Sequence, residues 1–101
     1  MIMSVETVRY VGIDLDSSGG DVIEALIEAA KEENTGVEVD NFSTFIKLKA
    51  PNQLIIKRNL VEEHLGRDWS MDELHIYMAS YFGFMEEMDD EQLVIRWNNI
   101  E

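Results

Sequence analysis

Apolar and polar positions follow two different periods along this chain, which predicts a mixture of strands and helices. The β-branched and aromatic residues of Thr7–Ile13 predict a first strand, and the turn formers of residues 15–20 predict a loop after it. Asp21–Glu33 has apolar residues at helical spacing, so we expect a helix there. Asn34 and Gly36 are residue types that end helices. The apolar face of this helix is Val22, Ile23, Leu26, Ile27 and Ala30.

The middle of the chain predicts short strands followed by a short helix. Val37–Phe42 and Thr44–Leu48 are rich in β-branched and aromatic residues, and Gln53–Lys57 continues that pattern. Because the turn former Pro51 lies between the last two segments, we expect Thr44–Leu48 and Gln53–Lys57 to pair as a hairpin. Leu60–Leu65 then predicts a short helix.

The next part of the chain fits a helix and a strand almost equally well. Ser70 and Glu73 stand three residues apart, which is the capping-box arrangement that opens a helix. Apolar residues continue at helical spacing beyond them, but they also alternate as in a strand. Gly83 weakens a helix, and its aromatic neighbours favour a sheet. We therefore expect the helix to end near Tyr77 and a strand to begin near Ala79.

An acidic loop, Glu86–Glu91, and a last strand, Gln92–Trp97, complete the predicted order β-α-β-β-β-α-α-β-β. This order is typical of an α+β fold. A chain of 101 residues with 46% hydrophobic content supports one compact domain with its own core. We expect residues 1–101 to form that single domain from two small β-α-β-type halves, approximately 1–50 and 51–101.

The charge is strongly acidic, because 8 basic against 21 acidic residues give a formal net charge of −13. Such a field repels nucleic-acid backbones and anionic membranes, and it favours a partner with a basic docking face. We therefore expect neither nucleic acid nor membrane as a partner. No apolar run approaches the ~20 residues of a membrane span, and the N-terminus lacks the pattern of a signal peptide. The sequence predicts a cytoplasmic protein.

Residues that carry redox or metal chemistry are scarce in this chain. It has no cysteine, which excludes disulfides, iron–sulfur clusters and thiolate zinc sites. Asp14 and Asp16 open a stretch similar to a calcium-binding loop, but the position that needs a bidentate glutamate holds Ala25. Asp72 and His75 match half of a di-iron carboxylate–histidine motif, and no second half is present. We predict no catalytic residue, no metal ligand and no cofactor.

Methionines and aromatic residues crowd into the last third of the chain. Most of them must fill a core, but adaptable and aromatic side chains also anchor binding faces. Composition alone therefore leaves a core role and an interface role both open for this region.

A block of residues that begins at the last residue of the predicted strand Gln53–Lys57, together with the last strand, carries a resemblance to a known family. The residues are Lys57, Arg58, Val61, Glu62, Glu63, Gly66, Arg67, Trp69, Glu73, Leu74, His75, Ser80, Gly83 and Leu93–Trp97. In this pattern the chain resembles the small effector (coupling) proteins of bacterial multicomponent di-iron monooxygenases. The similarity is closest to the phenol hydroxylase branch, with the toluene monooxygenase effectors next.

The resemblance implies a regulatory protein that is not an enzyme and holds no cofactor. Effectors of this kind bind the di-iron hydroxylase component close to its buried metal site, shift its helices, and control the access of substrate, oxygen and electrons. The reductase and, where present, a ferredoxin are separate proteins. We expect the free effector to be a monomer or a weak dimer.

A docking face is expected where the aromatic residues of this block gather. The partner-binding residues that we predict are Trp69, Met78, Ser80, Tyr81, Phe82 and Gly83. Two other classes of function stay open from the residues alone. One is an acidic DNA-mimic inhibitor, which the net charge favours, and the other is a small-molecule-binding regulatory domain, which needs a ligand-sized apolar pocket.

Overall fold

The computed structural model describes residues 9–97, which form three helices and seven strands. The helices are α1 (Asp21–Glu33), α2 (Arg58–Leu65) and α3 (Asp72–Tyr77), with a 3₁₀ turn, Ser17–Gly19, before α1. The strands are β1 (Tyr10–Asp16), β2 (Glu38–Asn41), β3 (Phe45–Pro51), β4 (Gln53–Lys57), β5 (Met78–Phe82), β6 (Phe84–Met88) and β7 (Gln92–Arg96). The α+β class is confirmed, and the predicted order of elements holds with one additional strand, β6.

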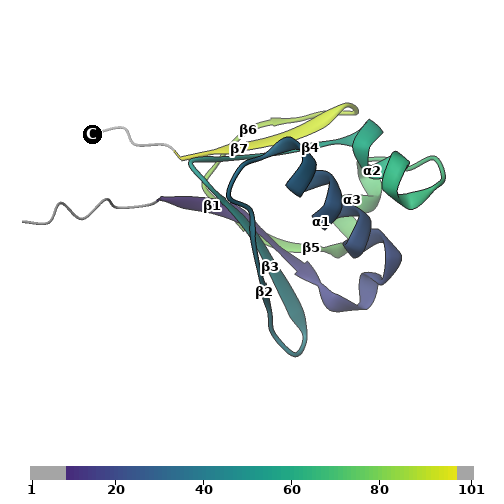
Figure 1. Cartoon of the computed structure of the whole chain (residues 1–101), viewed down its shortest axis with the longest axis horizontal. Helices are drawn as coiled ribbons and strands as arrows, with labels where there is room; N and C mark the ends of the chain where they lie inside the picture. The colour runs from purple at the N-terminus through teal and green to yellow at the C-terminus, as the bar shows by residue number, and fades with distance from the viewer. Residues whose placement is uncertain (1–8, 98–101) are drawn as a thin grey trace, which may run out of the picture.

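The strands form two antiparallel sheets. The first sheet has the order β2-β3-β1-β5, and the second has the order β4-β7-β6. In Figure 1 the second sheet runs along the top of the view, the β2–β3 hairpin projects downwards, and α2 and α3 lie together on the right. The pairing of β5 with β1 brings a late segment of the chain into the first sheet. The division of the chain into halves near residue 50 stays a prediction.

One apolar core lies between α1 and the inner faces of both sheets. On β1 the alternate residues Val11, Ile13 and Leu15 are 0% exposed. Burying one such side chain stabilises the fold by about 1.5–3 kcal/mol, so packing holds α1 in place more than its helix propensity does. The buried residues of α1 are Val22, Ile23, Ala25, Leu26, Ala29 and Ala30, whereas Ile27 of the predicted apolar face is only half-buried.

The first strand lies further along the chain than predicted. Residues 7 and 8 are outside the described residues, and β1 continues through Asp16 into the segment predicted as a loop. The reason is that Asp14 and Asp16 alternate with Ile13 and Leu15, so their carboxylates leave the core on the opposite face of the strand.

The predicted hairpin between Thr44–Leu48 and Gln53–Lys57 is wrong. β3 pairs with β1 and β2, whereas β4 pairs with β7 in the other sheet. The chain changes sheet at Asn52, which has a left-handed φ of 71° that asparagine tolerates. The Asn52 N–H donates to the carbonyl of Arg9 at 2.8 Å, and the Asn52 carbonyl accepts from the N–H of Trp97 at 2.8 Å. The turn-forming residues Pro51 and Asn52 therefore join two different sheets and do not close a hairpin.

A second change of sheet occurs at Gly83, between β5 and β6. Its φ of 115° is one that L side chains rarely adopt. A Cβ atom at Gly83 would lie 2.7 Å from Cγ2 of Ile95 and 2.7 Å from Cγ1 of Val11. Only glycine therefore fits where the chain passes between the sheets.

The acidic segment after Gly83 is a strand for most of its length, so the predicted loop Glu86–Glu91 is wrong in its first half. β6 includes Glu86 and Glu87, and its register against β7 shifts between Met85 and Glu87. This bulge places both Met85 and Met88 against the core although they are three residues apart. A strand with a bulge lacks simple alternation, and this explains why the pattern indicated a loop.

The outer edge of β4 is occupied by a side chain. Asn34 follows the last residue of α1, and its amide Nδ2 donates to the carbonyl of Ile55 at 2.8 Å. Its Oδ1 accepts from the N–H of Ile55 at 2.9 Å. One residue of an edge strand thus has both backbone groups satisfied by one side-chain amide.

Candidate docking surface

The first sheet has an outer face that points away from the core. Strand register decides which residues share this face, because residues directly opposite each other project to the same side. We call this surface the outer face. It consists of Tyr10, Asp14, Asp16, Glu38, Asp40, Phe42, Phe45, Lys47, Lys49, Ser80 and Phe82.

The centre of the outer face is a network that spans β1, β3 and β5. The Lys47 ammonium lies 3.0 Å from Oδ1 of Asp14 and 4.6 Å from the ring centroid of Phe82. The hydroxyl of Ser80 donates to Oδ2 of Asp14 at 2.8 Å. The ammonium of Lys47 over the Phe82 ring, and the Asp14 carboxylate shared by Lys47 and Ser80, fix the positions of these side chains at the surface.

A second network repeats this arrangement towards the start of β1. The Lys49 ammonium lies 3.2 Å from the carboxylate of Asp40 and 4.8 Å from the ring centroid of Tyr10. The Tyr10 hydroxyl donates to Glu38 at 2.8 Å. That hydrogen bond is the main reason why the pKa of Tyr10 is raised. The outer face therefore presents rings and cations with their acidic partners already in place.

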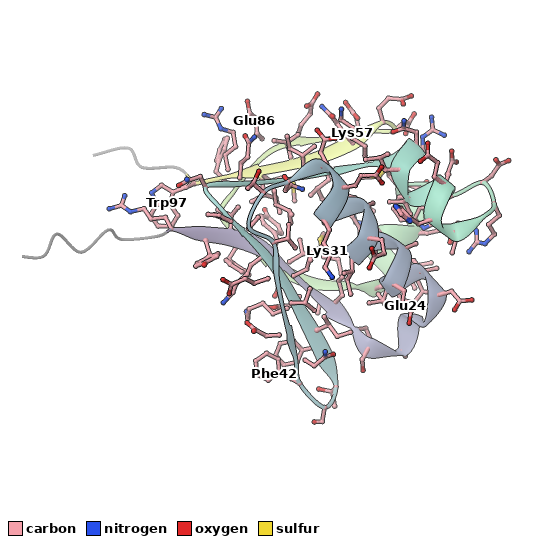
Figure 2. All side chains as sticks on the ribbon, in the orientation of Figure 1. Glu24, Lys31, Phe42, Lys57, Glu86 and Trp97 are labelled. Carbon is pink, nitrogen blue, oxygen red and sulfur yellow. The ribbon has the colours of Figure 1, made fainter. Side chains whose placement is uncertain are left out.

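The end of the β2–β3 hairpin adds stacked aromatic rings. Phe42 and Phe45 have ring centroids 4.6 Å apart and planes 18° apart. Phe42 is 48% exposed, and Figure 2 shows it on the projecting hairpin, away from the helices. Exposed aromatic rings of this kind are typical anchors of protein–protein interfaces.

β5 divides the predicted docking residues between the two faces of the first sheet. Ser80 and Phe82 lie opposite Asp14 and Gly12, so both belong to the outer face. Met78 and Tyr81 lie opposite Leu15 and Ile13, so both belong to the core side. Tyr81 is nevertheless 46% exposed, since β5 is an edge strand. Gly83 is the exposed residue at which the chain leaves the sheet.

Trp69 does not join the other predicted docking residues. It is 3% exposed and packs in the core. Its backbone N–H donates to Oε2 of Glu62 at 2.8 Å, and its indole Nε1 is buried without a partner among the described residues. The sequence indicated an aromatic anchor at this position, but in the free protein the ring fills the interior.

Trp69 belongs to a set of contacts that we call the α2 corner, made by Arg58, Glu62, Trp69 and Glu91. The guanidinium of Arg58 lies 3.3 Å from Glu62 and 3.2 Å from Glu91. Its hydrogen bond to Glu91 is the largest cause of the raised pKa of Arg58. These contacts tie α2 to the turn between β6 and β7. Arg58, Glu62 and Trp69 are also among the residues that carry the family resemblance. That part of the resemblance therefore reflects residues that stabilise the fold.

The sequence prediction missed the residues that β1 and β3 contribute to the outer face. Lys47 and Lys49 alternate with Leu48 and Ala50, which are 0% exposed. That alternation is a signal for one open face on β3. It does not reveal that Phe82 lies beneath Lys47, because the contact depends on strand pairing between distant segments.

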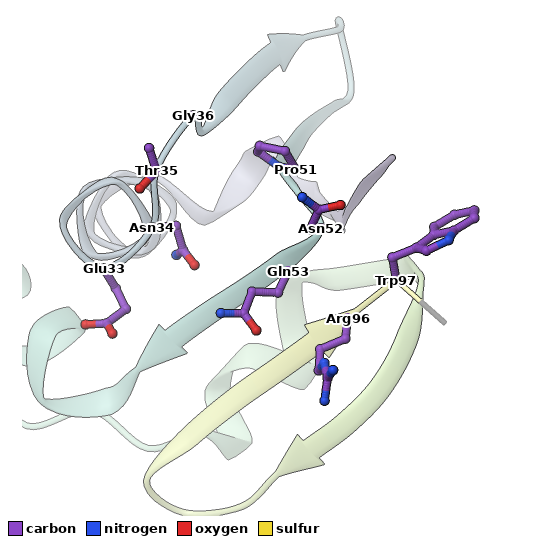
Figure 3. A pocket seen from close by; sticks show the side chains of 9 residues that line it. All are labelled: Glu33, Asn34, Thr35, Gly36, Pro51, Asn52, Gln53, Arg96 and Trp97. Atoms are coloured by element: carbon purple, nitrogen blue, oxygen red, sulfur yellow. The ribbon is translucent and has the colours of Figure 1, made fainter. Parts of the chain in front are cut away.

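A polar cleft of about 580 Å³ lies at the corner where β3 passes into β4. Figure 3 shows its lining, in which Trp97 points away from the other side chains. Arg96 is 3.1 Å from Glu86, and Arg9 lies over the Trp97 ring at 5.3 Å. The cleft does not have the apolar character that a small-molecule site requires. Its lining residues are Glu33, Asn34, Thr35, Gly36, Pro51, Asn52, Gln53, Arg96 and Trp97.

Residues 9–97 contain neither a metal-binding cluster nor a membrane-spanning helix. Within this part of the chain no group of three or more histidine and acidic side chains is placed to hold a metal ion. No helix among the same residues is long and apolar enough to cross a membrane.

Comparison with known proteins decides the family. The model of the MmoB/DmpM family matches residues 9–96. The chain belongs to the MmoB/DmpM family. A relative in this family is the stimulatory component DmpM of phenol 2-monooxygenase from Pseudomonas sp. (strain CF600), which is 30% identical over 90 residues, 89% of this chain and 94% of that protein. The resemblance seen in the sequence is therefore confirmed.

Solved structures agree with this membership of the MmoB/DmpM family. A chain in a structure of a phenol hydroxylase–regulatory protein complex matches with a TM-score of 0.76 and 33% identity, covering 89% of this chain and 100% of that chain. A second structure of such a complex gives 0.72 and 30%, covering 88% and 100%. The soluble methane monooxygenase regulatory protein B has a TM-score of 0.63 at 17% identity, covering 97% of this chain and 72% of that one, and shows the shared fold.

Proposed function

We propose that this chain is the regulatory component of a multicomponent phenol or aromatic monooxygenase. It binds the di-iron hydroxylase component and tunes the access of substrate, oxygen and electrons to it. The observation that carries this function is the match over nearly the whole length of both chains to a stimulatory component of phenol 2-monooxygenase. The match to a chain from a phenol hydroxylase–regulatory protein complex supports the same partner.

The physical basis of such regulation is a difference in affinity. A protein that adds no chemistry of its own shifts a hydroxylase only as far as it binds one conformation better than another. In this proposal the chain is not an enzyme, holds no cofactor, and acts in the cytoplasm beside a separate reductase. Its net charge of −13 accelerates encounter with a basic surface on the partner.

The outer face and the adjoining edge of β5 are the proposed contact with the hydroxylase. Ser80 and Phe82 belong to this face, and Tyr81 projects from the same edge strand. Met78 and Gly83 border it at the two ends of β5. A specific interface buries roughly 1,200–2,000 Å² in total, and a few aromatic anchors dominate its free energy. A sheet face with four such rings provides these anchors.

The carboxylates of the outer face make a DNA-mimic function less suitable. A mimic of duplex DNA needs free negative charges in rows. On the outer face Asp14 pairs with Lys47, Asp40 pairs with Lys49, and Glu38 accepts from Tyr10. Three of the four carboxylates of the outer face are therefore already engaged by Lys47 or Lys49, and Asp16 alone has no cationic partner among the described residues.

The proposed function is tested by reconstitution. Purified chain is titrated into a phenol hydroxylase and its reductase, and product is measured against the electrons consumed. We expect turnover to rise to a maximum near one effector per hydroxylase active site. Equal turnover with and without the chain under coupled conditions would show that it has a different function.

A further inference from the structure

A small pocket opens beside the centre of the outer face. It has a volume of about 370 Å³. Its walls come from β1, the end of the β2–β3 hairpin and the start of β5. The lining residues are Asp14, Asp16, Thr44, Phe45, Ala79 and Ser80.

The backbone of β5 creates this opening. Ser80 pairs with Asp14 and Met78 pairs with Leu15, so Ala79 has no partner on β1 and forms a bulge. β5 begins at Met78, so Asp16 pairs with β3 alone. The space beside Asp16 is therefore a consequence of strand register.

The pocket has an uncompensated negative charge. Asp14 receives the ammonium of Lys47 and the hydroxyl of Ser80. Asp16 accepts the backbone N–H of Ser18 at 2.9 Å through Oδ1, the Ser18 side chain is a second cause of its lowered pKa, and no cationic side chain within residues 9–97 pairs with it. With two carboxylates and one ammonium, one negative charge remains. Oδ2 of Asp16 has no hydrogen bond to the described residues, and it borders an otherwise mainly apolar pocket.

The rings of the outer face indicate what complements this charge. Phe82 lies under Lys47, and Tyr10 lies under Lys49. Phe45 has a ring on the same face, stacked with Phe42, but no lysine or arginine within residues 9–97 lies over it. A cation from outside the chain, placed between the Phe45 ring and Asp16, would give Phe45 the arrangement that Phe82 and Tyr10 already have.

We propose that this pocket receives an arginine side chain of the hydroxylase. The inference rests on the proposed function, because it names the chemistry of the partner at the same surface. Arginine fits better than lysine, since its planar guanidinium stacks on a ring and pairs edge-on with a carboxylate at the same time. The volume accommodates one such side chain, and the negative field of the whole chain favours it.

The first experiment uses the isolated chain and a small probe. N-acetylarginine amide is titrated into labelled protein, and amide shifts are followed by NMR, with N-acetyllysine amide and N-acetylglutamine amide as comparisons. We expect saturable shifts at Ser18, Phe45 and Ala79 that are largest for the arginine probe. Shifts that are equal for the glutamine probe, or that occur elsewhere, would overturn the proposal.

The second experiment measures affinity for the hydroxylase. Asp16→Asn removes the charge and keeps an oxygen for the Ser18 N–H, so the fold is retained. Glu63→Gln on α2 is the matched control, because it makes the same charge change at an exposed position outside the outer face. We expect Asp16→Asn to weaken binding roughly tenfold, the scale of one partly desolvated ion pair, and Glu63→Gln to weaken it less than twofold.

The outcomes of the two experiments separate the proposals. Equal small losses for both variants mean general steering by charge, and the arginine pocket is then wrong. A chain that binds the arginine probe at Phe45 but never binds a hydroxylase keeps the pocket and overturns the proposed function. Binding to hydroxylase with no effect of Asp16→Asn keeps the function and overturns the pocket.

Discussion

The outer face and the α2 corner contain the same kinds of residue in opposite situations. Both combine aromatic rings, a basic side chain and carboxylates. In the α2 corner the ring of Trp69 is 3% exposed, whereas Phe42 on the outer face is 48% exposed. Arg58 binds acids on α2 and on the turn before β7, while Lys47 binds Asp14 across neighbouring strands of one sheet. Burial, not composition, separates a scaffold from a surface.

This difference predicts different consequences of mutation. Removing a buried ring leaves a cavity and lowers the free energy of unfolding. Removing an exposed ring costs little stability but deletes an anchor for a partner. Substitutions in the α2 corner should therefore change folding and binding together, and substitutions on the outer face should change binding alone.

The largest effect is expected from Trp69→Ala. Truncating a buried tryptophan costs about 3–5 kcal/mol, which is a large part of the stability of a domain of this size. Denaturant unfolding followed by circular dichroism measures the loss. Trp69→Phe is the comparison, because it removes the indole N–H that lacks a partner but keeps a smaller aromatic ring, so it should cost less stability than Trp69→Ala. If Trp69→Ala folds normally and loses only hydroxylase binding, the contrast between the two regions is wrong.

An intermediate effect is expected from Phe82→Ala, and it should appear in binding alone. The ring is half-buried beneath Lys47 on the proposed contact surface. Loss of an interface anchor costs about 1–2 kcal/mol of binding, or roughly five- to thirtyfold in Kd. Affinity for the hydroxylase and the thermal midpoint are measured on the same preparation. A fall in the midpoint that accounts for the whole loss of affinity would place Phe82 with Trp69 among the scaffold residues.

The smallest effect concerns the pH dependence of stability at Asp16. The backbone N–H of Ser18 binds its carboxylate and is the main reason why the pKa of Asp16 lies below 3.8. Because the pKa of Asp16 is lower in the folded state than in the unfolded state, its ionised carboxylate stabilises the fold at pH values above the unfolded pKa. This contribution is lost as the pH falls through the folded-state pKa. The difference in thermal midpoint between the wild type and Asp16→Asn should be constant down to about pH 5 and shrink below pH ~4. A difference that grows on acidification would contradict this assignment.

The elements with simple periods could be predicted from the sequence. α1 has the predicted bounds, β4 has the predicted bounds, and α3 ends at Tyr77 as expected. The failures lie where the period breaks or the chain changes sheet. The bulge in β6 after Met85 hides a strand, and the corner at Asn52 uses the same residue types as a hairpin turn. Local patterns carry no information about which sheet a strand joins.

The candidate site divides in the same way. Ser80 and Phe82 were predicted because aromatic residues cluster around them in the sequence. Lys47 and Tyr10 were missed because strand pairing alone places them on the same face as Phe82. Trp69 was assigned to the surface because a sequence gives the size and chemistry of a ring but not its depth.

The amide of Asn34 has a consequence for self-association. An unpaired strand edge is a template on which a second chain can add its own strand, and this is a common route to aggregation. In the second sheet β6 is an edge strand with an open outer edge. Its bulge and its acidic side chains oppose the addition of a strand from another molecule. At β4 the bonds that an added strand would need at Ile55 are already made by Asn34. The Asn34 side chain thus makes the backbone hydrogen bonds at Ile55 that a fourth strand would make, and it opposes the addition of a strand from a second molecule.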